Sequence, residues 1–204
     1  MVRHAVFMMA GTLISRVLGL AREVMVAALF GATRAMDAFN VAYTLSNLAR
    51  QLLAEGALSA AFVPVFSQAL TKSKEKALAL ARSTMTVLMC VTFLVVGLGI
   101  AGAPALVKFM APGFDEAESL LAVGLTRWMF PFLIFISLEA LTMGTLNSLG
   151  SFFVPALSPA LSNLAFIITA PFFAAKFGVY GLALSVICGG FAHFMTQWLY
   201  GFRM

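Results

Sequence analysis

The chain has 204 residues, of which 62% are hydrophobic and 10% charged, and its formal net charge is +5. Soluble domains average about 25% charged residues, and residues 83–107 and 177–202 contain none at all, so the composition excludes an ordinary soluble domain. The positive balance is typical of cytoplasmic loops and buried arginines in a membrane protein, and we expect no nucleic-acid partner.

Hydropathy and helix-breaking residues predict an all-α, polytopic membrane bundle in which residues 1–204 form a single domain. Its six expected transmembrane helices cover residues 5–31, 37–69, 82–110, 119–147, 153–175 and 179–201. The second is longer than a straight crossing of the bilayer needs, so we expect it to tilt or to extend beyond the membrane. Pro131 lies inside the fourth and predicts a kink there.

The basic residues outside the apolar segments predict the orientation. Six lie on one side of the expected bundle and three on the other, namely Arg3, Lys72, Lys74, Lys76, Arg82 and Arg203 against Arg34, Lys108 and Lys176. Cytoplasmic loops carry the excess of lysine and arginine in membrane proteins. We therefore expect both termini in the cytoplasm, and an even number of crossings fits this because it places the two termini on the same side.

Two arginines interrupt the first apolar segment. A charged side chain at mid-bilayer costs about 2.5–3.5 kcal/mol on insertion scales, so such residues usually serve a function. At 100° per residue, Glu23 falls within about 20° of Arg16, whereas Arg22 lies about 120° away and about 9 Å further along the axis. The arginines could form a cationic wall for a phosphate group. Alternatively, Arg22 could pair with Glu23 or with a carboxylate of the second helix and only hold the bundle together.

The second segment adds further polar residues. Asn47 and Arg50 are three residues apart and should share a helix face. Glu55 lies about 140° from Arg50 around the helix, so it could serve as the counter-ion of Arg50 only if the helix bends. It could equally pair with an arginine of the first helix. Arg34 and Asp37 flank the turn between the first two helices, where they could form a surface ion pair or a gate.

Glu139 is a lone carboxylate inside the fourth segment, where it could relay protons or balance an arginine. His193 is most simply a polar group that faces the bundle interior. The glycines of residues 97–102 match the letters of a dinucleotide-binding motif, but no strand precedes them. We expect no enzymatic activity, catalytic residues, cofactor or metal site.

Several segments carry a resemblance to a known family. They are Ser15–Arg22, Phe30–Ala32, Asp37–Phe39, Asn47–Arg50, Ala54–Val65, Ala111–Phe114, Leu146–Ser148 and Val154–Ala156. In these segments the chain resembles the N-terminal part of the MurJ/MviN family of lipid II flippases, which belongs to the multidrug/oligosaccharidyl-lipid/polysaccharide exporter superfamily. The matching residues are densest within 11–66, and beyond residue 165 the similarity is one of hydropathy alone.

The resemblance implies a transporter with two lobes of six helices around a central cationic cavity. Such a protein moves lipid II, the undecaprenyl-pyrophosphate-linked peptidoglycan precursor, from the inner to the outer leaflet of the bacterial cytoplasmic membrane by alternating access. The family's important arginines correspond to Arg16, Arg22 and Arg50, its helix-2 aspartate to Asp37, and the acidic residue after its second arginine to Glu23.

One departure from the family concerns length, because only six helices are expected here. The resemblance therefore implies either a fragment whose C-terminal lobe is missing, a truncated gene product, or assembly of two copies. Besides lipid II and membrane lipids, a second lobe or a second copy is thus an expected partner. An exporter of other polyprenyl-linked oligosaccharides or of drugs, and an inactive membrane remnant, remain alternatives.

Overall fold

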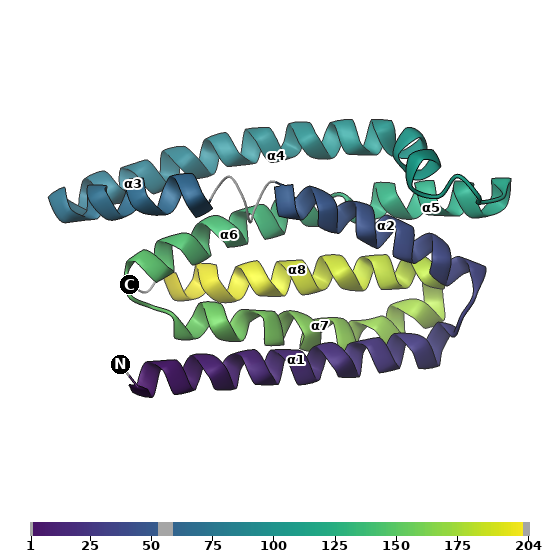
Figure 1. Cartoon of the computed structure of the whole chain (residues 1–204), viewed down its shortest axis with the longest axis horizontal. Coiled ribbons are helices and arrows are strands. Elements are labelled where there is room, and N and C mark those ends of the chain that lie inside the picture. The colour runs from purple at the N-terminus through teal and green to yellow at the C-terminus, as the bar shows by residue number, and fades with distance from the viewer. Residues whose placement is uncertain (1, 53–58, 202–204) are drawn as a thin grey trace.

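The computed structural model describes residues 2–52 and 59–201, and the described part is all α-helical (Figure 1). The helices are α1 (Val2–Phe30), α2 (Arg34–Arg50), α3 (Ser59–Lys72), α4 (Lys74–Met110), α5 (Glu116–Met129), α6 (Phe132–Ser148), α7 (Phe153–Phe177) and α8 (Val179–Gly201). The predicted all-α class is confirmed. Within the described residues, four stretches are long and apolar enough to cross a membrane: α4, α5 together with α6, α7 and α8.

The helices lie roughly parallel to one long axis (Figure 1). Helix α7 packs between α1 and α8, and α8 packs in turn on α6. On the other side of α6 lie α4 and α3, while α2 crosses α5. Helix α1 begins and α8 ends at the same end of the bundle, which the α3–α4 and α6–α7 turns also share (Figure 1). This end is called the basic end below, because Lys72, Lys74 and Lys76 lie in or beside its α3–α4 turn.

Two predicted helices each correspond to two elements in the structure. Within the described residues, the expected helix 37–69 corresponds to α2, which ends at Arg50, and to α3, which begins at Ser59; residues 53–58 lie outside the described part, so the expected single helix stays a prediction. Helices α2 and α3 pack in different hydrophobic clusters: α2 lies in the central core, and α3 packs with α4 and α6 through Phe62 and Phe66.

The expected helix 119–147 is divided at Pro131, where a kink was predicted. Helix α5 ends at Met129 and α6 begins at Phe132. Proline has no N–H to continue the helical ladder, and here Leu133 N–H donates to Phe130 O at 3.0 Å, which closes a tight turn. Helix α4 also begins earlier than expected, at Lys74 instead of residue 82. Its added turns are anchored by Ala77, which is fully buried against α3.

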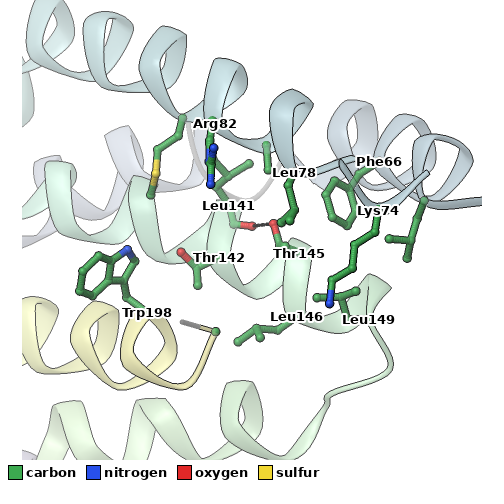
Figure 2. A pocket seen from close by; sticks show the side chains of 14 residues that line it. Phe66, Lys74, Leu78, Arg82, Leu141, Thr142, Thr145, Leu146, Leu149 and Trp198 are labelled. Atoms are coloured by element: carbon green, nitrogen blue, oxygen red, sulfur yellow. Dashed lines mark hydrogen bonds between the residues drawn. The ribbon is translucent and has the colours of Figure 1, made fainter. Parts of the chain in front are cut away.

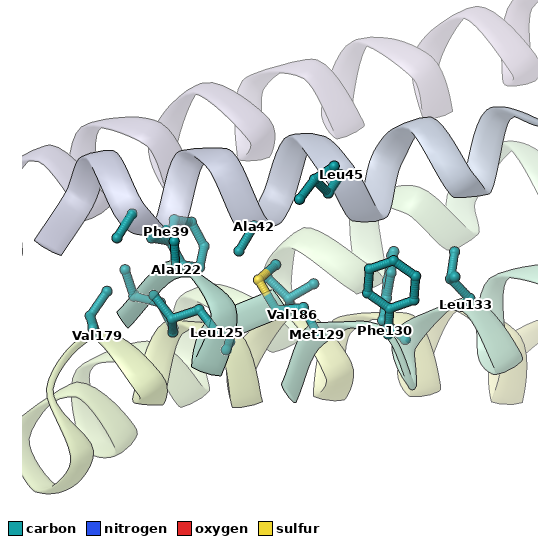
Figure 3. Close-up of a cluster of buried hydrophobic side chains, with 14 of the residues drawn as sticks. Phe39, Ala42, Leu45, Ala122, Leu125, Met129, Phe130, Leu133, Val179 and Val186 are labelled. Carbon is teal, nitrogen blue, oxygen red and sulfur yellow. The ribbon is translucent and has the colours of Figure 1, made fainter. Parts of the chain in front are cut away.

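The central core holds α2 against α5, α6 and α8 (Figure 3). Helix α2 contributes Phe39, Ala42 and Leu45, which meet Leu125 and Met129 of α5. Small residues such as Ala42 let helices approach closely, and van der Waals packing of this kind is what drives helix association within lipid. The core therefore fixes the position of α2, whose C-terminal end carries the predicted Asn47–Arg50 pair.

Close backbone approach at the α7–α8 turn yields a stability prediction. A β-carbon at Gly181 would collide with the backbone of Phe173 and Ala174, which cannot rotate away as a side chain could. We expect Gly181→Ala to lower the stability of the protein in detergent by about 1–3 kcal/mol, the usual range for overpacking. Thermal unfolding followed by circular dichroism measures the change. Gly102→Ala, in α4 with nothing within 4 Å of the added carbon, is the matched control and should be neutral or slightly stabilising. Equal melting temperatures for both variants would contradict the packing described here.

Candidate functional site

A polar cavity of about 200 Å³ lies between five helices. Its polar lining residues come from α1 (Arg22), α2 (Tyr43, Asn47, Arg50), α6 (Glu139), α7 (Ser162, Asn163) and α8 (His193). Phe132, Ile136, Pro159, Phe166, Val186 and Gly189 complete the wall. We refer to it as the cationic cavity, because two arginines line it against one carboxylate.

Arg22 enters this cavity between two aromatic rings. Its guanidinium carbon lies 5.8 Å from the ring centre of Tyr43 and 5.4 Å from that of Phe166. A guanidinium over an aromatic face within about 6 Å is stabilised by the ring quadrupole. Its Nη2 also donates to Glu23 Oε1 at 2.8 Å. The structural alternative of an Arg22–Glu23 pair is thus confirmed as a contact, and the same side chain lines the cavity.

Asn47 and Arg50 line the α2 side of the cavity together. Arg50 Nε donates to Asn47 Oδ1 at 3.2 Å, which confirms the predicted shared helix face. This bond orients the plane of the guanidinium, a group whose N–H donors lie in a fixed fork. A planar fork of donors suits the oxygens of a phosphate or carboxylate.

Glu139 is the carboxylate of the cavity and is only 6% exposed. It accepts a hydrogen bond from Gln197 Nε2 at 2.7 Å, and His193 Nε2 lies 3.4 Å from the same oxygen. His193 therefore faces the bundle interior, as predicted. Gln197 itself is fully buried, so α6 and α8 are joined here by a polar contact inside an apolar bundle.

Helix α7 closes the cavity against α1 through Asn163. Its Nδ2 donates to the backbone oxygen of Ser15 at 3.1 Å, beside Gly19, where no side chain intervenes. Sequence analysis did not select Asn163, Tyr43 or Gln197. A signal did exist for Asn163, which is the only amide side chain in the apolar run of α7.

The other predicted site residues lie elsewhere. Arg16, Glu23 and Asp37 are exposed and are not among the residues that line the cavity, so the structure does not bring Arg16 together with Arg22 and Arg50. Glu55 lies outside the described residues. The cavity thus unites four of the predicted residues, Arg22, Asn47, Arg50 and Glu139.

An ion pair between Arg34 and Asp37 was one of the two alternatives for this turn, and the ion pairs described for Arg34 are with other residues. Arg34 instead pairs with Asp115 at 2.9 Å and with Glu118 at 3.4 Å. Asp115 and Glu118 form the capping box of α5, so their carboxylates already cluster at that helix N-terminus. The fold brings this acidic cluster beside the start of α2, a proximity that the local spacing of Arg34 and Asp37 does not reveal.

The arrangement of charges suits an anion. Two guanidinium groups and an amide converge on a small space from α1 and α2, while Glu139 lies on the α6 side with its own donors. The volume is below the 300–1,000 Å³ typical of pockets for drug-sized ligands, so it can receive a compact anionic group and not a large molecule. The fold and this cavity define a polytopic α-helical membrane protein with a cationic interior.

Comparison with known proteins gives the family. The family model described as lipid II flippase MurJ matches residues 26–204. The chain belongs to this family of lipid II flippases.

Individual relatives agree with the family model. A lipid II flippase MurJ from Burkholderia cenocepacia is 46% identical over 191 residues, which cover 91% of this chain and 37% of that protein. A probable lipid II flippase MurJ from Treponema pallidum is 38% identical over 205 residues, which cover 94% of this chain and 38% of that protein. A solved structure of lipid II flippase MurJ in an inward closed conformation matches with a TM-score of 0.81 and 29% identity, over 95% of this chain and 41% of that one. The chain therefore spans about two fifths of the length of these proteins.

Proposed function

We propose that this chain takes part in moving lipid II from the inner to the outer leaflet of the bacterial cytoplasmic membrane by alternating access, without chemical conversion of the substrate. The observation that carries the proposal is the convergence of Arg22 and Arg50 on one cavity inside an apolar bundle. Lipid II contains a pyrophosphate, which is a compact anion of the kind that this cavity suits. Charge-assisted hydrogen bonds from arginine to phosphate are among the stronger polar contacts in proteins.

In this proposal residues 1–204 form one transmembrane domain with six crossings and both termini in the cytoplasm. Helix α1 supplies the first crossing, α2 with α3 the second, and α5 with α6 the fourth. The arrangement is supported by the start of α1 and the end of α8 at one end of the bundle (Figure 1). The lysines beside the α3–α4 turn lie at that same end, as the positive-inside rule expects of a cytoplasmic face.

We assign roles to the predicted residues accordingly. Arg22 and Arg50 bind the pyrophosphate, and Asn47 orients Arg50. Arg16 is exposed on α1, about 9 Å along the axis from Arg22 on the side of the basic end. There it receives the anion on its way to the cavity.

The acidic residues have supporting roles in this proposal. Glu23 holds the guanidinium of Arg22, while Asp37 and Glu55 act in gating. Glu139 balances the cavity charge or relays a proton during the transport cycle. The rest of the cavity wall comes from a C-terminal lobe or a second copy of this chain.

Growth rescue tests the proposal. A bacterium depleted of its own lipid II flippase would express this chain alone, with a co-expressed C-terminal lobe from the Burkholderia relative, or as a chimera in which it replaces the matched segment of that relative. We expect the chimera to restore growth. Failure of the chimera, despite normal membrane insertion, would contradict the proposal. Rescue by the chain alone would indicate self-assembly, whereas rescue only with the second lobe would show that the lobe is required.

A further inference from the structure

A second cavity, of about 440 Å³, opens near the basic end of the bundle (Figure 2). It lies between α3, α4, α6 and α8, whereas α1, α2 and α7 contribute only to the cationic cavity. None of its lining residues is shared with the cationic cavity. We call it the lateral groove, and its occupant need not be the transported substrate.

The floor and walls of the lateral groove are apolar. Phe66, Leu141 and Leu146 are almost fully buried and form its base. Thr142 and Thr145 of α6 also line it, but their hydroxyls donate to backbone oxygens of their own helix, at 2.8 and 2.9 Å. The interior of the groove therefore presents hydrocarbon and offers few hydrogen bonds to a polar molecule.

Two cations border this apolar space. Lys74 and Arg82 both belong to α4 and line the groove with Leu78 between them, at successive four-residue steps. Eight residues of helix span about 12 Å. Figure 2 shows both charged side chains at the groove, with Lys74 near Leu146 and Leu149 and Arg82 near Leu141.

The groove also has the position expected of a lipid site. Trp198 lines it from the last turn of α8 and is 38% exposed, and tryptophan is enriched where membrane hydrocarbon meets the headgroups. Lys72 and Lys76 add positive charge at the same end. Basic pockets between transmembrane helices on the cytoplasmic side bind anionic lipid headgroups.

We propose that the lateral groove binds an anionic glycerophospholipid of the bilayer. Its phosphodiester contacts Lys74 and Arg82, and the first part of an acyl chain lies over Phe66, Leu141 and Leu146. Charge complementarity selects an anionic over a zwitterionic headgroup, and the apolar floor selects a lipid over a soluble phosphate. The inference is independent of lipid II as the transported molecule.

Quenching of Trp198 fluorescence by brominated lipids tests this site. The chain has only two tryptophans, so Trp128→Phe leaves Trp198 as the sole reporter. The variant is reconstituted in phosphatidylcholine vesicles with rising fractions of phosphatidylglycerol brominated on its acyl chains. Brominated phosphatidylcholine gives the reference curve. We expect half-maximal quenching at a lower fraction of the anionic lipid than of the zwitterionic one.

Charge variants separate the groove from general surface attraction. Lys74→Gln and Arg82→Gln should each raise the half-maximal fraction of phosphatidylglycerol by roughly fivefold, the effect of about one basic residue near an anionic surface. The matched double variant Lys72→Gln/Lys76→Gln removes two charges from the same end, but neither residue lines the groove, so selectivity should persist. Circular dichroism confirms that each variant is folded.

Three results would overturn the proposal. One is an equal response of Trp198 to both brominated lipids in the parent protein. The second is loss of selectivity in Lys72→Gln/Lys76→Gln as large as in the groove variants, which would show only surface attraction. The third is resistance of Trp198 to quenching by either lipid, which would mean that protein occupies the groove.

Discussion

Arg50→Ala and Arg22→Ala, each introduced into the chimera with the Burkholderia relative, are expected to abolish growth rescue. Each removes a charged donor from the cationic cavity. A hydrogen bond to a charged group contributes about 1.5–3 kcal/mol, so lipid II binding should weaken by roughly ten- to a hundredfold for each arginine. The matched variants Arg22→Lys and Arg50→Lys keep the positive charge but lose the planar fork of donors. They should restore growth only in part.

Stability and surface charge provide the controls for this result. Arg22→Ala also removes the contacts with Tyr43 and Phe166, each of the order of 0.5–1 kcal/mol at a partly exposed site, so its thermal unfolding is measured in parallel. Lys108→Ala removes a cation from an exposed position outside the cavity and should leave growth unchanged. Normal growth with Arg22→Ala or Arg50→Ala would contradict the assignment of the cavity.

Glu139→Gln is expected to preserve the fold and to reduce transport by about tenfold or more. Glutamine has the same shape and keeps an oxygen that can accept the hydrogen bond from Gln197, which is 2.7 Å in the structure. The variant thus removes the negative charge without leaving the buried donor unpaired. Both proposed roles of Glu139 need that charge, and a change of 1.4 kcal/mol in the relative energy of two transport states already corresponds to a tenfold effect.

Glu139→Ala separates the charge from the packing. It leaves Gln197 Nε2 buried without this acceptor, a loss of about 1–3 kcal/mol in water-soluble proteins and of less in membranes. We therefore expect a lower melting temperature for Glu139→Ala than for Glu139→Gln. Transport by Glu139→Gln at the rate of the parent protein would exclude a charge-dependent role.

Contacts within one helix could be predicted from the sequence. The shared face of Asn47 and Arg50 follows from helical spacing alone, and the structure confirms it. The break at Pro131 follows from the missing N–H of proline. The bounds of α8, Val179–Gly201, also agree with the prediction. Gly178 separates α8 from α7, and its φ of +58° is a backbone conformation that favours glycine.

Contacts between helices could not be predicted in this way. The acceptor of Gln197 is 58 residues away, and the partner of Arg34 at Asp115 is 81 residues away. Both pairs depend on which helices pack together, and the hydropathy of a single chain does not contain that information. The same holds for the aromatic rings around Arg22, which come from α2 and α7.

The length of α4 shows a second limit of prediction from hydropathy. Lys74 and Lys76 were left outside the expected helix 82–110 because they are charged, yet they continue the helix beyond its apolar part. Charge marks where a segment leaves the hydrocarbon and does not mark where the helix ends. This contributed to missing the lateral groove, since Lys74, one of its two cations, lies on that extension.

Direct measurement of translocation tests the central claim. Fluorescently labelled lipid II would be incorporated into vesicles that contain the purified chimera, and its movement from the inner to the outer leaflet would be followed with a membrane-impermeant quencher. We predict faster movement than in protein-free vesicles, and a return to the protein-free rate with Arg50→Ala. Equal rates in all three preparations would contradict the account of the cationic cavity as part of a lipid II pathway.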